Sequence, residues 1–146
     1  MIENEVKNHK EGKPAGICWK INSLQDLKTM EALYKASQAG LPVLLIVRGI
    51  CCIRPQRKGL SENIFIKSIV GEYLEHTRLY YFHNAGDPKI YGGSADVMVR
   101  SFDRRIESLF ELVNTRSKNL AITILDWNLR DTKNSYEMQE DGTYWK

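Results

Sequence analysis

Two residue types that handle phosphate stand at the ends of predicted strands in this chain. Arg48 directly follows the apolar run "PVLLIV" (42–47), and His76 precedes "RLYYF" (78–82). In α/β proteins, ligands collect beyond the carboxyl ends of covered strands, where Arg48 is expected to lie. A guanidinium presents a planar fork of donors suited to phosphate oxygens, and an imidazole near a phosphate acts as nucleophile or proton donor. These two residues raise the hypothesis of a phosphate site.

Each residue also has an ordinary structural interpretation. An arginine at a strand end can pair with a neighbouring carboxylate, and position alone gives that alternative similar weight. A lone histidine before a strand is usually a surface residue or is hydrogen-bonded to the backbone. Gly49 favours a ligand site, because it lacks a side chain that would keep a ligand away from the backbone. We expect His83, in the turn-like "FHNAGD", and His9, on a predicted helix, to be structural or solvated.

The three cysteines indicate neither a metal site nor a redox site. Cys51 and Cys52 are adjacent, and no second ligand pair stands at zinc spacing. So few cysteines do not form a disulfide framework, which favours a reducing, cytoplasmic location. No apolar run approaches the ~20 residues that span a bilayer, so we expect no transmembrane segment. The N-terminus also lacks the apolar centre of a signal peptide.

Basic residues gather in two clusters, although the formal net charge of +3 is too small to indicate a partner by itself. The first cluster follows Arg48 and contains no acid, and the second contains only Asp103 among its arginines. Such clusters are either solvated faces or a surface for a polyanion. The candidate polyanion contacts are Arg54, Arg57, Lys58, Arg100, Arg104 and Arg105.

The hydrophobic pattern and the length of 146 residues predict one α/β domain over residues 1–146. We expect helices over the opening segment up to Gly12, over 22–40 and around 120–127, with one helical turn at 71–76. The expected strands cover 15–21, 42–47, 64–70, 78–82, 89–94 and 104–112, and the last segment is also compatible with a helix. Residues 136–146 are expected to form a hairpin with Asp141 and Gly142 in its turn.

The first two strands and the helix between them predict a βαβ unit. We expect Ser23 to cap this helix, Asp26 to complete a capping-box-like pair and Gly40 to end it. Its predicted buried stripe consists of Leu24, Leu27, Met30 and Leu33 or Tyr34. The continuous apolar run at 42–47 is typical of a strand covered on both faces. We therefore expect a mixed, mostly parallel sheet flanked by helices.

Several blocks of sequence together resemble the last domain of bacterial polyphosphate kinase of the long multidomain type. The blocks agree in order and spacing over essentially the whole chain, and they read "IENEVKNHKEGKPAGICWKINSL", "LYKASQAGLPVLLIVRGICCIRP", "GLSEN", "SIVGEYLEHTRLYYF" and "SADVMVRSFDRRIE". Three departures are visible. Val97 replaces a tryptophan of the family, the family's "MPRN" is replaced at 98–101, and Gln56 stands where the family often has glycine.

The resemblance implies reversible transfer of the terminal phosphate of ATP to inorganic polyphosphate. It implies a phospholipase D-like domain that pairs with a preceding domain, with the ATP site where the two meet, in an enzyme expected to be a homo-oligomer. Arg48 and His76 then contact the nucleotide or its phosphates, His76 is also the catalytic candidate, and the basic clusters guide polyphosphate. The phosphorylated histidine and the residues that bind magnesium belong to the preceding domain, so we expect this fragment alone to be inactive.

Two other functions were weighed against these residues. A non-catalytic module could bind polyphosphate or nucleic acid through the basic clusters, since single-strand binders pair cations with stacking aromatics. Tyr80, Tyr81 and Phe82 alternate between the faces of a strand, however, and core packing explains most of them, so no nucleic acid is expected. A phospholipase-like hydrolase would need lysine and aspartate where Arg78 and His83 stand, and "GGSAD" only echoes the glycine–serine pair of that family. We reject phosphodiester hydrolysis.

Overall fold

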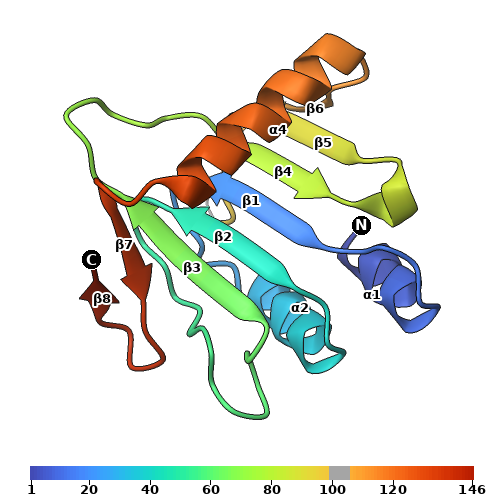
Figure 1. Ribbon diagram of the computed structural model, residues 1–146, viewed down its shortest axis with the longest axis horizontal. Helices are drawn as coiled ribbons and strands as arrows, with labels where there is room; N and C mark the ends of the chain where they lie inside the picture. Colours follow the sequence, from blue (N-terminus) through green and yellow to red (C-terminus); the bar gives the residue numbers. More distant parts are fainter. Residues whose placement is uncertain (99–105) are drawn as a thin grey trace.

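The computed structural model describes residues 1–98 and 106–146, and a mixed β-sheet forms its centre (Figure 1). The eight strands of this sheet follow the order β6-β5-β4-β1-β2-β3-β7-β8. Their bounds are Ile17–Ile21 (β1), Val43–Val47 (β2), Ile64–Ile69 (β3), Leu79–Phe82 (β4), Lys89–Gly93 (β5), Leu109–Glu111 (β6), Ser135–Met138 (β7) and Tyr144–Trp145 (β8). The α/β class predicted from the sequence is confirmed.

Parallel pairing is confined to the centre of the sheet. Strand β2 runs parallel to both β1 and β3, whereas the pairs on either side of these three strands are antiparallel. The expectation of a mostly parallel sheet was therefore wrong. Parallel neighbours need a long crossover, whereas antiparallel ones can be joined by tight turns. The β1–β2 and β2–β3 connections make such crossovers, whereas short turns join β4 to β5 and β7 to β8.

Helices cover both faces of the sheet. Helices α1 (Ile2–Lys10) and α2 (Leu27–Gln38) pack on one face, over a core that includes Trp19, Leu33 and Leu45. Helix α4 (Thr115–Arg130) crosses β4 and β1 on the other face, over Cys18, Ile46 and Leu125 (Figure 1). Alternate residues of β1 and β2 thus enter different cores, which confirms that β2 is covered on both sides.

Helix α2 begins later than predicted. Its N-cap is Asp26, whose carboxylate accepts a hydrogen bond from the Thr29 amide at 2.8 Å, so the expectation that Ser23 caps the helix was wrong. The backbone N–H groups of Asn22 and Ser23 instead donate to Asp96, at 2.8 and 3.3 Å, which keeps this segment out of the helix. Leu33 is buried as predicted, whereas Leu27, in the exposed first turn, is not.

The remaining elements agree with the sequence pattern except in one loop. The C-terminal hairpin is confirmed, and the ambiguous segment contains the short strand β6. The helical turn predicted at 71–76 was wrong: residues 70–78 form an irregular loop between β3 and β4, called the histidine loop from here on. In residues 1–98 and 106–146, no helix is long and apolar enough to cross a membrane.

Candidate functional site

The sheet order brings the two predicted site residues to the same edge. Strands β3 and β4 lie on opposite sides of the β1–β2 pair, so the histidine loop that joins them crosses the carboxyl ends of β2 and β1 (Figure 1). Arg48 directly follows β2, and His76 lies in the crossing loop. A strand end and a loop that are separate in the sequence therefore meet where α/β proteins bind ligands.

Arg48 is tied to the residue that precedes the histidine. Its Nη1 donates a hydrogen bond to the backbone carbonyl of Glu75 at 2.9 Å, and its own amide donates to the Ile21 carbonyl at 3.3 Å. The side chain is half-buried, and His76, the residue after Glu75, is exposed. Within the described residues, Arg48 does not form the carboxylate pair that was the structural alternative. The other N–H groups of this guanidinium are suited to donate hydrogen bonds to a ligand oxygen.

Lys20 makes a second attachment to the histidine loop. It lies on β1, its side chain is only 4% exposed, and its Nζ lies 3.2 Å from a carboxylate oxygen of Glu75. The same ammonium donates to the Thr77 carbonyl at 3.5 Å. The sequence analysis did not single out this residue. A lysine inside the apolar strand "ICWKI" is nevertheless a signal, because a buried charge almost always has a partner.

A buried ion pair fixes the far end of the loop. Arg78 Nη2 contacts Asp96 at 3.0 Å, with both side chains largely buried. Burial alone raises the pKa of Asp96, but the hydrogen bonds from Arg78 and from the amides of Asn22 and Ser23 outweigh it, so this pKa lies below its usual value. With its amide oriented to satisfy both partners, the side-chain oxygen of Asn22 also accepts from Arg78. Asp96 therefore ties the ends of β1 and β5 to the start of β4.

Gly49 serves the geometry of this edge in a way the sequence did not indicate. Its amide donates to the Asn22 carbonyl at 2.7 Å, and a Cβ at this position would lie 2.9 Å from that same oxygen. The absence of a side chain therefore allows the chain after β2 to lie against the chain after β1. A role in admitting a ligand, suggested by the sequence, remains a prediction.

The other two histidines lie elsewhere. His83 is at the opposite end of β4 from His76, where its Nδ1 accepts from the Gly86 amide and caps the short 3-10 turn η1 (Asn84–Gly86). His9 lies on α1 against Gly40. Of the three histidines in the chain, only His76 lies at the edge with Arg48. The cap on η1 gives His83 a structural role, and the expectation that His9 is structural or solvated remains a prediction.

The first basic cluster lies away from this edge. We call residues 54–58 the basic loop; it belongs to the connection that returns from the carboxyl end of β2 to the amino end of β3 (Figure 1). Arg57 Nε donates to the Glu140 carbonyl at 3.2 Å, the Arg54 guanidinium covers Gly142, and Lys58 is exposed. The two arginines thus hold the turn of the β7–β8 hairpin. The second predicted cluster, Arg100, Arg104 and Arg105, lies outside the described residues.

The aromatic run on β4 belongs to the core. Tyr80 and Phe82 pack edge-to-face against Trp19, with ring centroids 5.2 and 5.9 Å apart, and both are buried. This confirms the packing predicted from their alternation and leaves no stacked platform of Tyr80 and Phe82 for nucleic-acid bases.

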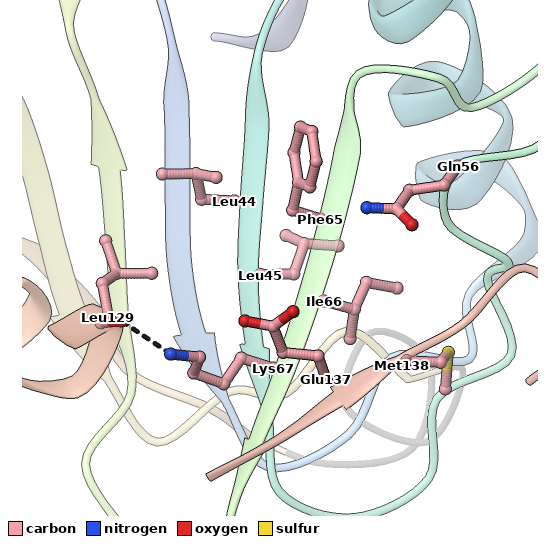
Figure 2. A pocket seen from close by; sticks show the side chains of 9 residues that line it. All are labelled: Leu44, Leu45, Gln56, Phe65, Ile66, Lys67, Leu129, Glu137 and Met138. Atoms are coloured by element: carbon pink, nitrogen blue, oxygen red, sulfur yellow. Dashed lines mark hydrogen bonds between the residues drawn. The ribbon is translucent and has the colours of Figure 1, made fainter. Parts of the chain in front are cut away.

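A well-formed hollow of about 290 Å³ lies beside β3 and β7, apart from Arg48 and His76 (Figure 2). Its lining is mostly apolar, and its lysine, Lys67, is already bonded to the carbonyls of Leu129 and Asp131, at 2.6 and 3.0 Å, at the end of α4. Figure 2 shows that the Gln56 amide and the Glu137 carboxylate lie among the apolar side chains, and that Lys67 is bonded to the Leu129 carbonyl. Nothing in this lining suits phosphate transfer.

The donors at the Arg48–His76 edge do not fit a magnesium ion. Magnesium prefers oxygen ligands, above all carboxylates, but Glu75 and Asp96 are each paired with a cation. Across residues 1–98 and 106–146, no cluster of three histidine, cysteine or acidic side chains is placed to hold a metal.

Two of the cysteines are poorly reactive. Burial raises the pKa of the Cys18 thiol to about 12 and that of Cys51 to about 11, so both remain protonated near neutral pH.

The fold resembles that of two other known structures. NucT from Helicobacter pylori aligns with a TM-score of 0.61 and 14% identity over 88% of this chain and 87% of its own. Nuc from Salmonella typhimurium, a phospholipase D family member, aligns with a TM-score of 0.60 and 13% identity over 92% and 88% of the two chains. At such identities the likeness concerns the fold alone.

The chain belongs to the family described as polyphosphate kinase C-terminal domain 2, whose sequence profile matches residues 1–146. A polyphosphate kinase of Helicobacter pylori is 47% identical over 100% of this chain and 21% of its own length. The crystal structure of polyphosphate kinase from Porphyromonas gingivalis aligns with a TM-score of 0.95 and 38% identity over 99% of this chain and 22% of that one. The chain spans about a fifth of the length of the relatives it matches.

Proposed function

We propose that this chain acts as one domain of a polyphosphate kinase, an enzyme that reversibly transfers the terminal phosphate of ATP to inorganic polyphosphate. Arg48 and His76 are its contribution to the nucleotide site, and His76 is its catalytic candidate. One observation supports the assignment of the site: Arg48 donates to the carbonyl of Glu75, the residue before His76, so the fork of donors and the loop that carries the exposed histidine meet at one edge of the sheet.

The two residues differ in the chemistry that they offer. The guanidinium can hold two phosphate oxygens at once. An imidazole nitrogen can donate a proton or a hydrogen bond to a phosphate oxygen, or accept a phosphoryl group. Phosphoryl transfer depends on several such donors acting together, and one arginine and one histidine make only part of that set.

The proposal assigns the remaining groups to other parts of the enzyme. ATP and ADP are the nucleotides. Magnesium is assigned to preceding domains, because the described carboxylates at this edge are already paired, and the phosphorylated histidine is assigned there too.

The exposed apolar side chains of the edge strand β6 support contact with those domains or with a second copy in a homo-oligomer. The free thiols Cys18, Cys51 and Cys52 support a reducing, cytoplasmic location.

A chimaera tests the proposal. This chain would replace the matching fifth of the Helicobacter pylori polyphosphate kinase, and ATP-dependent growth of polyphosphate would be measured for the chimaera and for the 146-residue chain alone. We expect synthesis by the chimaera, none by the isolated chain, and strong losses in Arg48→Ala and His76→Ala. Synthesis by the isolated chain would contradict the division of the site between domains. Full activity in both variants would overturn the assignment of these residues.

A further inference from the structure

Three consecutive backbone carbonyls in the histidine loop each accept a hydrogen bond from a different cationic side chain. The Glu75 carbonyl accepts from Arg48 at 2.9 Å, the His76 carbonyl from Arg78 at 3.3 Å, and the Thr77 carbonyl from Lys20 at 3.5 Å. Lys20 also pairs with the Glu75 carboxylate at 3.2 Å. Positive side chains from the ends of three neighbouring strands therefore surround the backbone of the histidine.

The loop depends on these side chains because it has little backbone support. Within the described part of the chain, residues 71–78 make no backbone–backbone hydrogen bond outside the strand ladders. Irregular loops without such bonds open at low cost in free energy. An exposed imidazole on this loop is held in place only as firmly as the side chains hold the backbone on either side of it.

We propose that Lys20 is a positioning residue for His76, acting through the Glu75 carboxylate and the Thr77 carbonyl. The inference rests on the proposed function, since it concerns how that site presents its histidine. Lys20 does not touch the substrate: its ammonium is almost fully buried and points to the loop. By fixing the residues directly before and after His76, it holds this histidine at the sheet edge where Arg48 lies.

The burial of Lys20 supports a dedicated role. A charged side chain inside an apolar strand is costly unless it is paired, and an apolar residue of similar size is often at least as good for stability. The partner, Glu75, is 44% exposed, so the pair joins the interior of the sheet to a surface loop rather than joining two core elements. The location of this pair therefore favours control of the loop over stabilisation of the core.

The inference is tested with Lys20→Met, Glu75→Gln and the double variant. Lys67→Met is the matched control, because Lys67 also donates to two backbone carbonyls, at the end of α4. In the 146-residue chain, NMR relaxation of residues 75–77 measures the order of the loop. In the chimaera, kcat and the KM for ATP are measured. Glu75→Gln, at an exposed position, decides the question if Lys20→Met fails to fold.

We expect residues 75–77 to become mobile in both single variants and to stay ordered in Lys67→Met. The kcat should fall roughly tenfold or more, with the KM for ATP changed less than about threefold, because the histidine is misplaced rather than removed. The double variant should be no worse than Lys20→Met alone, since Lys20→Met already removes the ion pair that Glu75→Gln breaks.

An ordered loop and a kcat within about twofold of the parent in Glu75→Gln would overturn the inference. Equal losses in Lys67→Met would also overturn it, because they would show a general effect of losing a lysine. If the parent chimaera is inactive while the loop loosens in both variants, the proposed function fails, but Lys20 is still the residue that anchors the loop.

Discussion

The sheet edge that holds Arg48 and His76, called the histidine edge from here on, uses the same residue types as the basic loop, but in a different way. At the histidine edge, Arg48 and Arg78 bond to a carbonyl and a buried carboxylate at the ends of three central strands. In the basic loop, Arg54 and Arg57 lie over the turn of an exposed hairpin at the margin of the sheet. The first pair is held by the core of the fold, and the second by surface contacts.

The difference shows that the density of charge in the sequence does not reveal which cations the fold holds rigidly. The basic loop has more cations per residue, yet two of its side chains are used to hold the hairpin. At the histidine edge, Lys20 and Arg78 are themselves largely buried, and each is fixed in direction by a carboxylate, Glu75 or Asp96. Catalysis of phosphoryl transfer depends on preorganised donors, whereas attraction of a polyanion depends only on charge near the surface.

The largest effect on stability is expected for Asp96→Ala. The substitution leaves Arg78 largely buried without its carboxylate and removes the acceptor of the Asn22 and Ser23 amides. Breaking a buried pair in this way costs about 3–5 kcal/mol of unfolding free energy. Urea denaturation of the 146-residue chain measures the loss.

The exposed pair between Asp126 and Arg130 on α4 provides the control. It is an i,i+4 pair on the helix surface, so Asp126→Ala should cost less than about 0.5 kcal/mol. Equal losses in Asp96→Ala and Asp126→Ala would show that the histidine edge is no more strongly supported than the surface.

Gly49→Ala should have the next largest effect. The new Cβ would lie 2.9 Å from the Asn22 carbonyl, so the chain after β2 must move away from the chain after β1. We expect a loss of about 1–3 kcal/mol in urea denaturation. Gly71→Ala in the histidine loop is the control, because its Cβ would meet only the Asn134 side chain at 3.8 Å. If the two variants are equally stable, the close approach at Gly49 has no energetic consequence.

The stability contributed by Asp96 should depend on pH. Its pKa in the folded chain lies below the usual value near 4, so its contribution is present above that value and is lost as the pH falls through the lowered folded pKa. The difference in unfolding free energy between the parent chain and Asp96→Asn should therefore be constant above about pH 5 and shrink below about pH 4. A difference that grows towards acid pH would contradict the assigned direction of the shift.

The smallest effect on catalysis is expected from the basic loop. Replacing Arg54, Arg57 and Lys58 with alanine should flatten the salt dependence of polyphosphate binding, by analogy with counterion release from nucleic acids. In the chimaera, kcat at saturating substrate should stay within about twofold of the parent value, since these side chains lie away from His76. An unchanged salt dependence would mean that the loop is only a solvated face.

Much of the fold could be predicted because local pattern and tertiary packing agree. The apolar run of β2, the βαβ unit and the C-terminal hairpin all have strong periodic or turn signals. The start of α2 could not be predicted, because Asp96, far along the chain, binds the amides of Asn22 and Ser23. The share of antiparallel pairing was also missed, since strand order depends on which edges the later strands join.

Only part of the candidate site could be predicted from the sequence. Arg48 and His76 could be singled out because each stands next to a strand with apolar character. Lys20, Glu75 and Asp96 could not, because their importance comes from contacts between segments that are distant in the sequence. The role of Arg54 and Arg57 was likewise hidden, because the hairpin that they contact lies more than eighty residues further along the chain.

A direct comparison of Arg48→Ala with Arg57→Ala in the chimaera tests the central claim of a site at the histidine edge. Both changes remove one arginine that donates to a backbone carbonyl, so they differ mainly in location. If Arg48 supplies charge-assisted bonds to a transferring phosphate, its loss should lower the transfer rate roughly ten- to more than a hundredfold. Arg57→Ala should change the rate by less than about twofold. Equal rates in the two variants, or a greater loss in Arg57→Ala, would contradict this account.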